Sequence, residues 1–192
     1  ARIELDLGEV TPHVSGPDTV FAMKSLAEIA REEVAVHKAY LLSCVNGRGE
    51  DLEQAAAVLA GRTVAPTVKL YLAAASREIE DGARASGAWQ ALLDAGAVAL
   101  PPGCGACIGL GAGLLEPGEV GISATNRNFK GRMGSRDARC YLASPAVVAA
   151  SAAAGTICGP GEMPCGVLAR DYREFPADAA AAEVVEILDG FP

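Results

Sequence analysis

The chain has 192 residues, of which 51% are hydrophobic and 21% charged, and its formal net charge is −8. That length suits one domain, or two small ones, with a core that needs no disulfides, and the composition excludes intrinsic disorder. An acidic chain is a poor general binder of nucleic acid or of anionic membranes. No apolar run reaches the roughly 20 residues that a membrane span needs. The start, Ala1-Arg2-Ile3-Glu4, has neither an initiator Met nor a signal peptide, so we expect a piece of a longer protein.

Hydrophobic periodicity predicts alternating strands and helices along the chain. The predicted strands are residues 3–7, 38–43, 67–74, 98–100, 119–124 and 141–144. The predicted helices are residues 20–33, 50–61, 77–86, 88–95, 145–154 and 177–188. Residues 11–18, 104–115 and 156–176 are predicted to be a loop, a glycine-rich segment with a tight turn, and an irregular segment. This alternation favours parallel βαβ units and an α/β fold.

Reactive or polar side chains follow four of the predicted strands. Cys44 comes after 38–43, Cys104 and Cys107 come after 98–100, and the other two groups are Ser76-Arg77 and Asn126-Arg127-Asn128. Parallel sheets bind ligands at the carboxyl ends of their strands, so we expect these groups at one edge of one sheet.

The six cysteines are Cys44, Cys104, Cys107, Cys140, Cys158 and Cys165. Without a secretion signal, a metal or catalytic use is favoured over a disulfide framework. Three thiolates at the sheet edge are one fewer than an iron–sulfur cluster usually takes, which leaves one iron open as a Lewis acid. A thioredoxin-like dithiol at Cys104-Gly105-Ala106-Cys107 and a structural metal are the alternatives, although a zinc ribbon needs a second such pair. The remaining three cysteines are interpreted as small buried hydrophobes.

A cluster of cations follows the strand predicted at 119–124. Five of them fall within 13 residues: Arg127, Lys130, Arg132, Arg136 and Arg139. A solvated basic loop is the plain interpretation, but the interspersed Gly131 and Gly134 and the amides of Asn126 and Asn128 favour a binding site. Arginine matches a carboxylate bidentately, which suits a small polycarboxylic acid. Nucleic acid is the other possible anion, but no aromatic platform accompanies the cations.

Several segments together resemble the aconitase superfamily, in its order and spacing. They are Ser43-Cys44-Val45-Asn46-Gly47-Arg48, Gly103-Cys104-Gly105-Ala106-Cys107-Ile108-Gly109, Gly118-Glu119-Val120-Gly121-Ile122-Ser123, Asn126-Arg127-Asn128-Phe129-Lys130-Gly131-Arg132-Met133-Gly134-Ser135 and Tyr141-Leu142-Ala143-Ser144-Pro145. The resemblance implies the third, cluster-bearing domain of that superfamily, with a three-layer α/β/α fold and a mainly parallel sheet. The implied division is a lead-in segment at 1–18, an iron–sulfur α/β domain at 19–160 and a C-terminal extension with a final helix at 161–192. Thr11-Pro12-His13-Val14-Ser15-Gly16-Pro17 and the segment 111–119 are most similar to the homoaconitase branch, with the 3-isopropylmalate dehydratase large subunits as the alternative.

The resemblance also implies site residues and partners. It makes Cys44, Cys104 and Cys107 the ligands of a 4Fe–4S cluster, and it makes Asn126, Arg127 and Arg132 the residues that bind a small hydroxy polycarboxylate. The family's reaction is a dehydration and rehydration that moves a hydroxyl to the neighbouring carbon. Its catalytic base is a serine from another aconitase-type domain or a small subunit, so we expect no catalytic residue here and no turnover by this chain alone.

His13 and His37 are interpreted as structural. The cytoplasm is the expected compartment, and the mitochondrial matrix is the alternative. A fragment without a cluster, whether structural, zinc-bound or redox-active, is the competing class of function.

Overall fold

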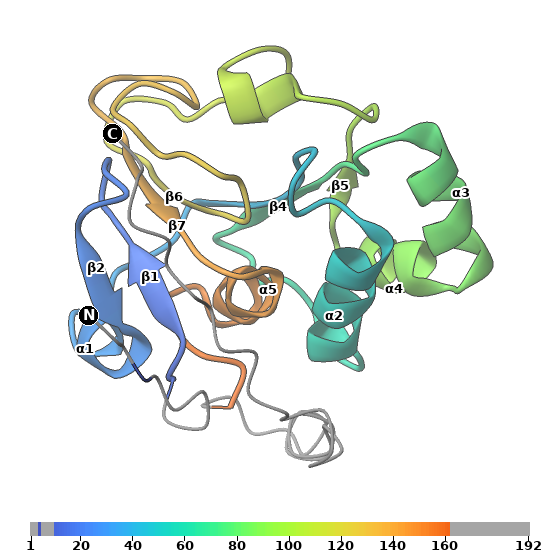
Figure 1. Cartoon of the computed structure of the whole chain (residues 1–192), viewed down its shortest axis with the longest axis horizontal. Coiled ribbons are helices and arrows are strands. Elements are labelled where there is room, and N and C mark those ends of the chain that lie inside the picture. Colours follow the sequence, from blue (N-terminus) through green and yellow to red (C-terminus); the bar gives the residue numbers. More distant parts are fainter. Residues whose placement is uncertain (1–3, 5–9, 162–192) are drawn as a thin grey trace.

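The computed structural model describes residue 4 and residues 10–161, and seven strands of that part form one sheet (Figure 1). The strands, in the order β2-β1-β7-β6-β3-β4-β5 across the sheet, are β2 (Met23–Ser25), β1 (His13–Ser15), β7 (Arg139–Leu142), β6 (Val120–Ser123), β3 (Lys38–Leu41), β4 (Lys69–Leu72) and β5 (Val98–Ala99). The five strands from β7 to β5 run parallel, while β1 is antiparallel to both β2 and β7. The prediction of a mainly parallel sheet is confirmed.

Of the helices in the described residues, four lie between successive strands and the last follows β7. They are α1 (Leu26–Ala30), α2 (Gly49–Leu59), α3 (Arg77–Ala85), α4 (Ala88–Asp94) and α5 (Pro145–Ala154). Ser76 caps α3 by accepting a hydrogen bond from the amide of Ile79, and Ser144 caps α5 in the same way through Val147. No helix within residues 10–161 has the length and apolar character needed to cross a bilayer.

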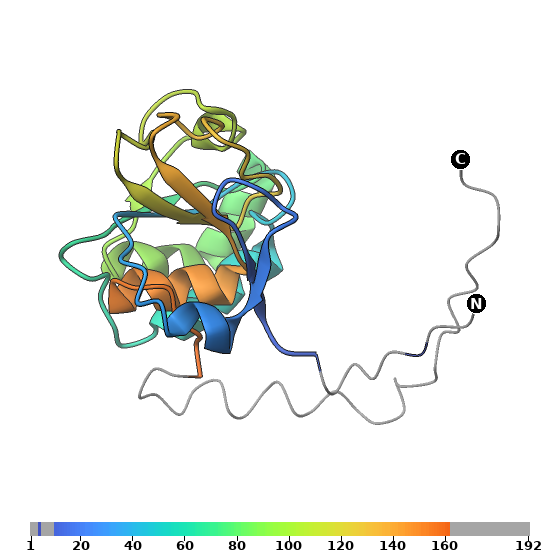
Figure 2. The same cartoon turned by 90° about the vertical axis from the view of Figure 1, so that its left-hand side faces the viewer.

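The two faces of the sheet carry different layers, because successive side chains of a strand point to opposite faces. Ala39 and Leu41 of β3 belong to a core shared with the five helices. Tyr40 and Leu42 belong to a second core, together with the short 3₁₀ helix η2 (Gly105–Ile108) and the loops around it. Figure 2 shows these loops across the sheet from α1 and α5. The three-layer α/β arrangement is thus confirmed, and in the described residues its second outer layer consists of η2 and long loops.

The N-terminal part of the domain differs from the sequence prediction. The predicted helix at 20–33 is correct only over Leu26–Ala30, because residues 23–25 pair with β1 and the helix starts only after Ser25. A capping box fixes that start, since Ser25 accepts from the amide of Glu28 while the Glu28 carboxylate accepts from the amide of Ser25. A loop throughout 11–18 was also wrong, because β1 lies within it and pairs with β7.

Other elements lie closer to their predicted bounds. β7 starts at Arg139, two residues before the predicted strand. The predicted strand at 3–7, Glu4 excepted, and the predicted helix at 177–188 fall outside the described residues. β1 and β2 lie on either side of the expected boundary at residue 18 and pair with each other, so the two segments share one sheet; the division into a lead-in and a domain stays a prediction.

Candidate functional site

The loop after β3 carries the first candidate thiol, Cys44, which is exposed. The residue before it, Ser43, is buried and has a φ of +122°, a conformation that costs energy for any residue with a Cβ. Its hydroxyl accepts hydrogen bonds from the amides of Val45, at 3.2 Å, and Asn46, at 3.1 Å. The turn that presents Cys44 is therefore held in a fixed, strained shape.

Backbone contacts join this turn to the loop after β4, and they join that loop to the turn after β5. A Cβ at Gly47 would meet the carbonyl oxygen of Ser43 at 2.6 Å and that of Ala73 at 3.0 Å, so only glycine fits there. The amide of Ala75 donates to the carbonyl of Gly47 at 2.9 Å, and the amide of Gly103 donates to that of Ala74 at 3.3 Å. The loop after β4 thus connects the Cys44 turn on one side to the start of the Cys104 turn on the other.

The other two candidate thiols share the turn that begins η2. Cys104 is exposed, Cys107 is 4% exposed, and the amide of Cys107 donates to the carbonyl of Cys104 at 2.9 Å. Gly103 and Gly105 have φ values of +127° and +39°, and a Cβ at either would meet no atom within 4 Å. The backbone around Cys104 therefore borders open space.

Side chains from the sheet hold the segment that follows η2, at Gly113 and Leu114. The Tyr40 hydroxyl donates to the carbonyl of Gly113 at 2.7 Å, and the Lys38 ammonium donates to the carbonyl of Leu114 at 2.7 Å. The Tyr40 ring stacks on Tyr71 with 5.6 Å between centroids, and burial raises the pKa of Tyr40 far above its ordinary value. Sequence reasoning missed these anchors, although the alternation of large side chains along strand 38–43 was a signal for them.

The loop after β6 brings the candidate carboxylate-binding residues to the same edge. Asn126 and Arg127 are exposed, and in the described part of the chain their side chains make no hydrogen bond or ion pair. Asn128 differs, because it is fully buried and its amide donates to the carbonyls of Ser15 at 3.2 Å, Thr19 at 3.4 Å and Cys140 at 3.1 Å. Asn128 therefore fastens the loop to β1 and β7, whereas Asn126 and Arg127, directly before it in the sequence, are exposed.

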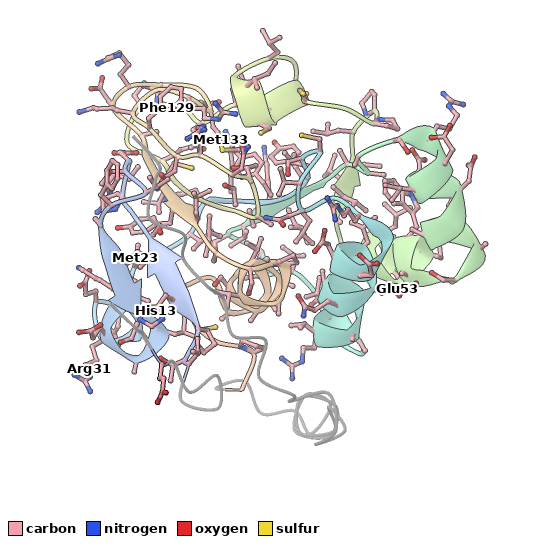
Figure 3. All side chains as sticks on the ribbon, viewed as in Figure 1. His13, Met23, Arg31, Glu53, Phe129 and Met133 are labelled. Atoms are coloured by element: carbon pink, nitrogen blue, oxygen red, sulfur yellow. The ribbon has the colours of Figure 1, made fainter. Side chains whose placement is uncertain are left out.

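Arg132 is the candidate residue that touches a candidate ligand. Its Nη2 donates to Sγ of Cys107 at 3.7 Å, and its guanidinium carbon lies 5.3 Å from the centroid of the Phe129 ring. Its Nε is buried without a hydrogen-bond partner. Figure 3 labels Phe129 and Met133, the neighbours of Arg132 along the loop, close to η2 and on the same side of the sheet. We call the segment between β6 and β7 (residues 124–138) the cation loop, and the turn around η2 (residues 103–109) the thiol turn. The two meet at Arg132 and Cys107.

The remaining cysteines have a different setting. Cys140 is 5% exposed, its sulfur lies 3.5 Å from the sulfur of Met133, and burial raises its pKa to about 12. The interpretation of Cys140 as a small buried hydrophobe is confirmed. Cys158 is half-buried, and Cys165 lies outside the described residues.

The donors at this edge are thiols that could hold an iron–sulfur cluster, the group that the sequence suggested. Within residues 10–161, no three or more His, Cys, Asp or Glu side chains are placed to hold a single metal ion. Thiolates of a cubane cluster bind different iron atoms, so they need not converge on one point as the ligands of one ion do. Three thiols, an open glycine backbone and an arginine N–H aimed at sulfur fit such a cluster chemically. That Cys44, Cys104 and Cys107 jointly hold it stays a prediction.

Together, the fold and this edge define an α/β domain with thiols in the loops after its parallel strands, one of which, Cys107, lies beside the guanidinium group of Arg132. The family model of the aconitase family (aconitate hydratase) matches residues 1–155. The chain belongs to the aconitase family.

Similar proteins extend this result. The chain is 56% identical over 208 residues to a protein of Eremothecium gossypii named "Homoaconitase, mitochondrial", covering 100% of the chain and 30% of that protein. Proteins of the same name from Cryptococcus neoformans var. neoformans serotype D (strain JEC21) and Candida albicans are 52% and 48% identical over 205 residues, again along the whole chain and over 28% and 30% of their own lengths. The chain thus spans less than a third of the length of these relatives.

Proposed function

We propose that this chain is the cluster-binding and carboxylate-binding part of a hydro-lyase of the homoaconitate hydratase type. The similarity to proteins named homoaconitase, along the whole chain, supports the type of reaction. The contact between Arg132 and Cys107 is the observation that carries the proposal, because it joins a cation suited to carboxylates with a thiol suited to iron. Cys44, Cys104 and Cys107 would hold a 4Fe–4S cluster, which supplies a Lewis acid for a substrate hydroxyl.

The chain's own residues bind and orient the substrate. The Nε–H of Arg132 is a buried donor without a partner, and a substrate carboxylate would satisfy it. Arg127 and Asn126 are exposed on the same loop, where a second carboxylate would meet a planar guanidinium and an amide. A hydroxy tricarboxylic acid has enough carboxylates to use both arginines, whereas a neutral ligand would leave them unpaired.

The catalytic base in this proposal comes from outside the chain. The relatives are more than three times as long as the segment they share with it, so proteins of this type have room for further domains. We place the base on a remaining aconitase-type domain or small subunit that closes over Arg127 and Arg132. The isolated chain would then bind the substrate without converting it.

The mitochondrial matrix is the compartment that we propose, in place of the cytoplasm expected first. The relatives carry the word mitochondrial in their names. A reducing compartment also suits three thiols that bind iron. Fractionation of cells that express the intact protein tests this, and recovery of the protein with cytosolic markers alone would contradict it.

Anaerobic reconstitution with iron and sulfide tests the cluster assignment. The chain should gain the broad visible absorbance of an iron–sulfur cluster, and Cys44→Ser, Cys104→Ser and Cys107→Ser should each lose most of it. Cys158→Ala is the matched control, since this cysteine lies outside the three loops, and it should take up as much iron as the unchanged chain. Iron uptake that none of the three serine variants reduces would contradict the assignment.

A second measurement addresses turnover and the competing class of function. The reconstituted chain should bind cis-homoaconitate, seen as a change in the cluster spectrum, and should not hydrate it. Appreciable hydration would place the catalytic base within this chain. A chain that takes up zinc but no cluster, or that cycles a Cys104–Cys107 disulfide instead, would favour a structural or redox fragment.

A further inference from the structure

Arg132 contacts more of the site than carboxylate binding requires. One edge of its guanidinium donates to Cys107 Sγ at 3.7 Å, and its face rests 5.3 Å from the centroid of Phe129. The amide of Arg132 donates to the carbonyl of Phe129 at 2.9 Å, which closes a turn and draws the aromatic ring toward the guanidinium. The side chain is thus held against the sulfur even without a bound acid.

The sulfur that Arg132 contacts is shielded from water. Cys107 is 4% exposed, and it packs with Ala106, Met133 and Cys140 in the second core. In such a setting a single positive charge beside a thiolate acts strongly, because the local dielectric is low. Hydrogen bonds to the sulfurs and the charge nearby are among the factors that set the reduction potential of an iron–sulfur cluster.

The geometry points to a second role for Arg132: it is a positioning residue that holds the Cys107 sulfur and raises the reduction potential of the cluster bound there. This inference rests on the proposed function, since it needs the cluster. It goes beyond carboxylate binding, because it operates in the substrate-free protein. A residue that bound only the substrate would leave the substrate-free cluster unchanged.

Arg132→Gln separates the two roles, since glutamine keeps an N–H donor and loses the charge. In the reconstituted, substrate-free chain we expect a more negative midpoint potential for the cluster and faster loss of iron to a chelator. Lys130→Gln is the matched control: it removes one positive charge from an exposed position on the same loop and should leave both quantities unchanged.

Arg132→Lys provides a second variant that keeps the charge but loses the planar fork. It should shift the potential less than Arg132→Gln and bind a dicarboxylate more weakly than the unchanged chain. If Arg132→Gln retains no cluster, the lysine variant carries the measurement. Circular dichroism verifies that each variant is folded.

Two results would overturn the inference, and they differ in what else they affect. A cluster with the same potential and the same iron loss in the unchanged chain and in the Arg132 variants would leave the proposed function standing and refute the second role. A folded chain that takes up no cluster at all would refute the proposed function, and the inference with it.

Discussion

The carbonyl oxygen of Arg132 lies against Gly109, so close that a Cβ at position 109 would meet it at 2.7 Å. Gly109 ends the thiol turn, and Arg132 belongs to the cation loop, so this approach packs the two loops backbone to backbone. A second contact supports the same packing, because the amide of Leu115 donates to the carbonyl of Met133 and the amide of Ser135 donates to that of Leu115. The two loops therefore behave as one unit.

Alanine at Gly109 should separate these loops, whereas alanine at Gly111 should not. Both glycines have a φ of +78°, but a Cβ at Gly111 would meet nothing within 4 Å. Gly111→Ala should cost about 1–2 kcal/mol of unfolding free energy from the left-handed backbone alone. Gly109→Ala adds a backbone clash to that cost, so it should be less stable than Gly111→Ala in urea and should retain the cluster for a shorter time. Equal stabilities and equal retention would refute the interlocked arrangement.

Asn128 should be a structural residue, and its replacement by aspartate should lower the unfolding free energy by an amount that depends on pH. Its amide donates to three carbonyls inside the protein, and a carboxylate there would face those oxygens without a proton to share. Asn128→Ala should lose about 1–3 kcal/mol of unfolding free energy because buried carbonyls lose their donor. Asn128→Asp should lose more at neutral pH.

The pH dependence of the aspartate variant follows from linkage. Burial and the facing carbonyls raise the folded-state pKa of the new carboxyl above its unfolded value of about 3.9. The protonated carboxyl of Asn128→Asp therefore contributes to the unfolding free energy in full below its unfolded pKa, and this contribution is lost as the pH rises through its folded pKa. Urea unfolding of Asn128→Asp and Asn128→Ala across that range measures it. A difference between the two variants that does not grow with pH would argue against the burial of this side chain.

The ends of β3 and β6 were predictable from the sequence, because these central strands are buried on both faces and read as apolar runs. The end of the exposed edge strand β5 was predictable for another reason, since Pro101-Pro102 follows it closely. That is why Cys44, Cys104 and Asn126 were placed correctly in loops after β3, β5 and β6. The role of Asn128 was not predictable, since two of its three contacts are with Ser15 and Thr19, which lie 113 and 109 residues away in the sequence. The sequence of the loop alone does not reveal which of its two asparagines is buried.

The hairpin of β1 and β2 escaped prediction for a related reason. Val20, Phe21 and Met23 are 37%, 93% and 65% exposed, yet apolar residues at these spacings read locally as a helix face. The strands are three residues long, and their conformation depends on pairing with each other and with β7. Tertiary pairing outweighs local pattern in elements this short.

The ion pair between Lys38 and Glu119 should stabilise the loop at Leu114, and this stabilisation should be lost in acid. The two side chains lie 2.6 Å apart and are 7% and 22% exposed, and Lys38 also donates to the carbonyl of Leu114. Burial raises the pKa of Glu119, but hydrogen bonds from the amide of Glu116 and from Lys38 outweigh it, so the pKa lies below its ordinary value. Such a group stabilises the fold above its unfolded pKa of about 4.3 and loses that contribution as the pH falls through the folded pKa.

Lys38→Met measures that contribution. We expect a loss of about 1–3 kcal/mol of unfolding free energy at neutral pH, because Leu114 and Glu119 lose their donor, and a smaller loss in acid, where Glu119 is protonated in either chain. Lys69→Met is the matched control, since Lys69 pairs with Lys38 across β3 and β4 and is exposed. An equal effect of the two substitutions at neutral pH would show that the ion pair contributes nothing beyond the lysine side chain.

Alkylation should distinguish the two exposed thiols of the site, Cys44 and Cys104, from the buried Cys140. Only a thiolate reacts readily, and burial holds the pKa of Cys140 at about 12, so at mildly alkaline pH iodoacetamide should leave it unmodified in the folded chain. Cys44 and Cys104 are exposed and should be modified first, as peptide mass mapping would show. Urea should expose Cys140 and equalise the rates. After reconstitution Cys44 and Cys104 should become protected, because they would then bind iron together with Cys107, while Cys140 stays as slow as before. Modification of Cys140 as fast as Cys104 in the folded chain would contradict its place in the second core.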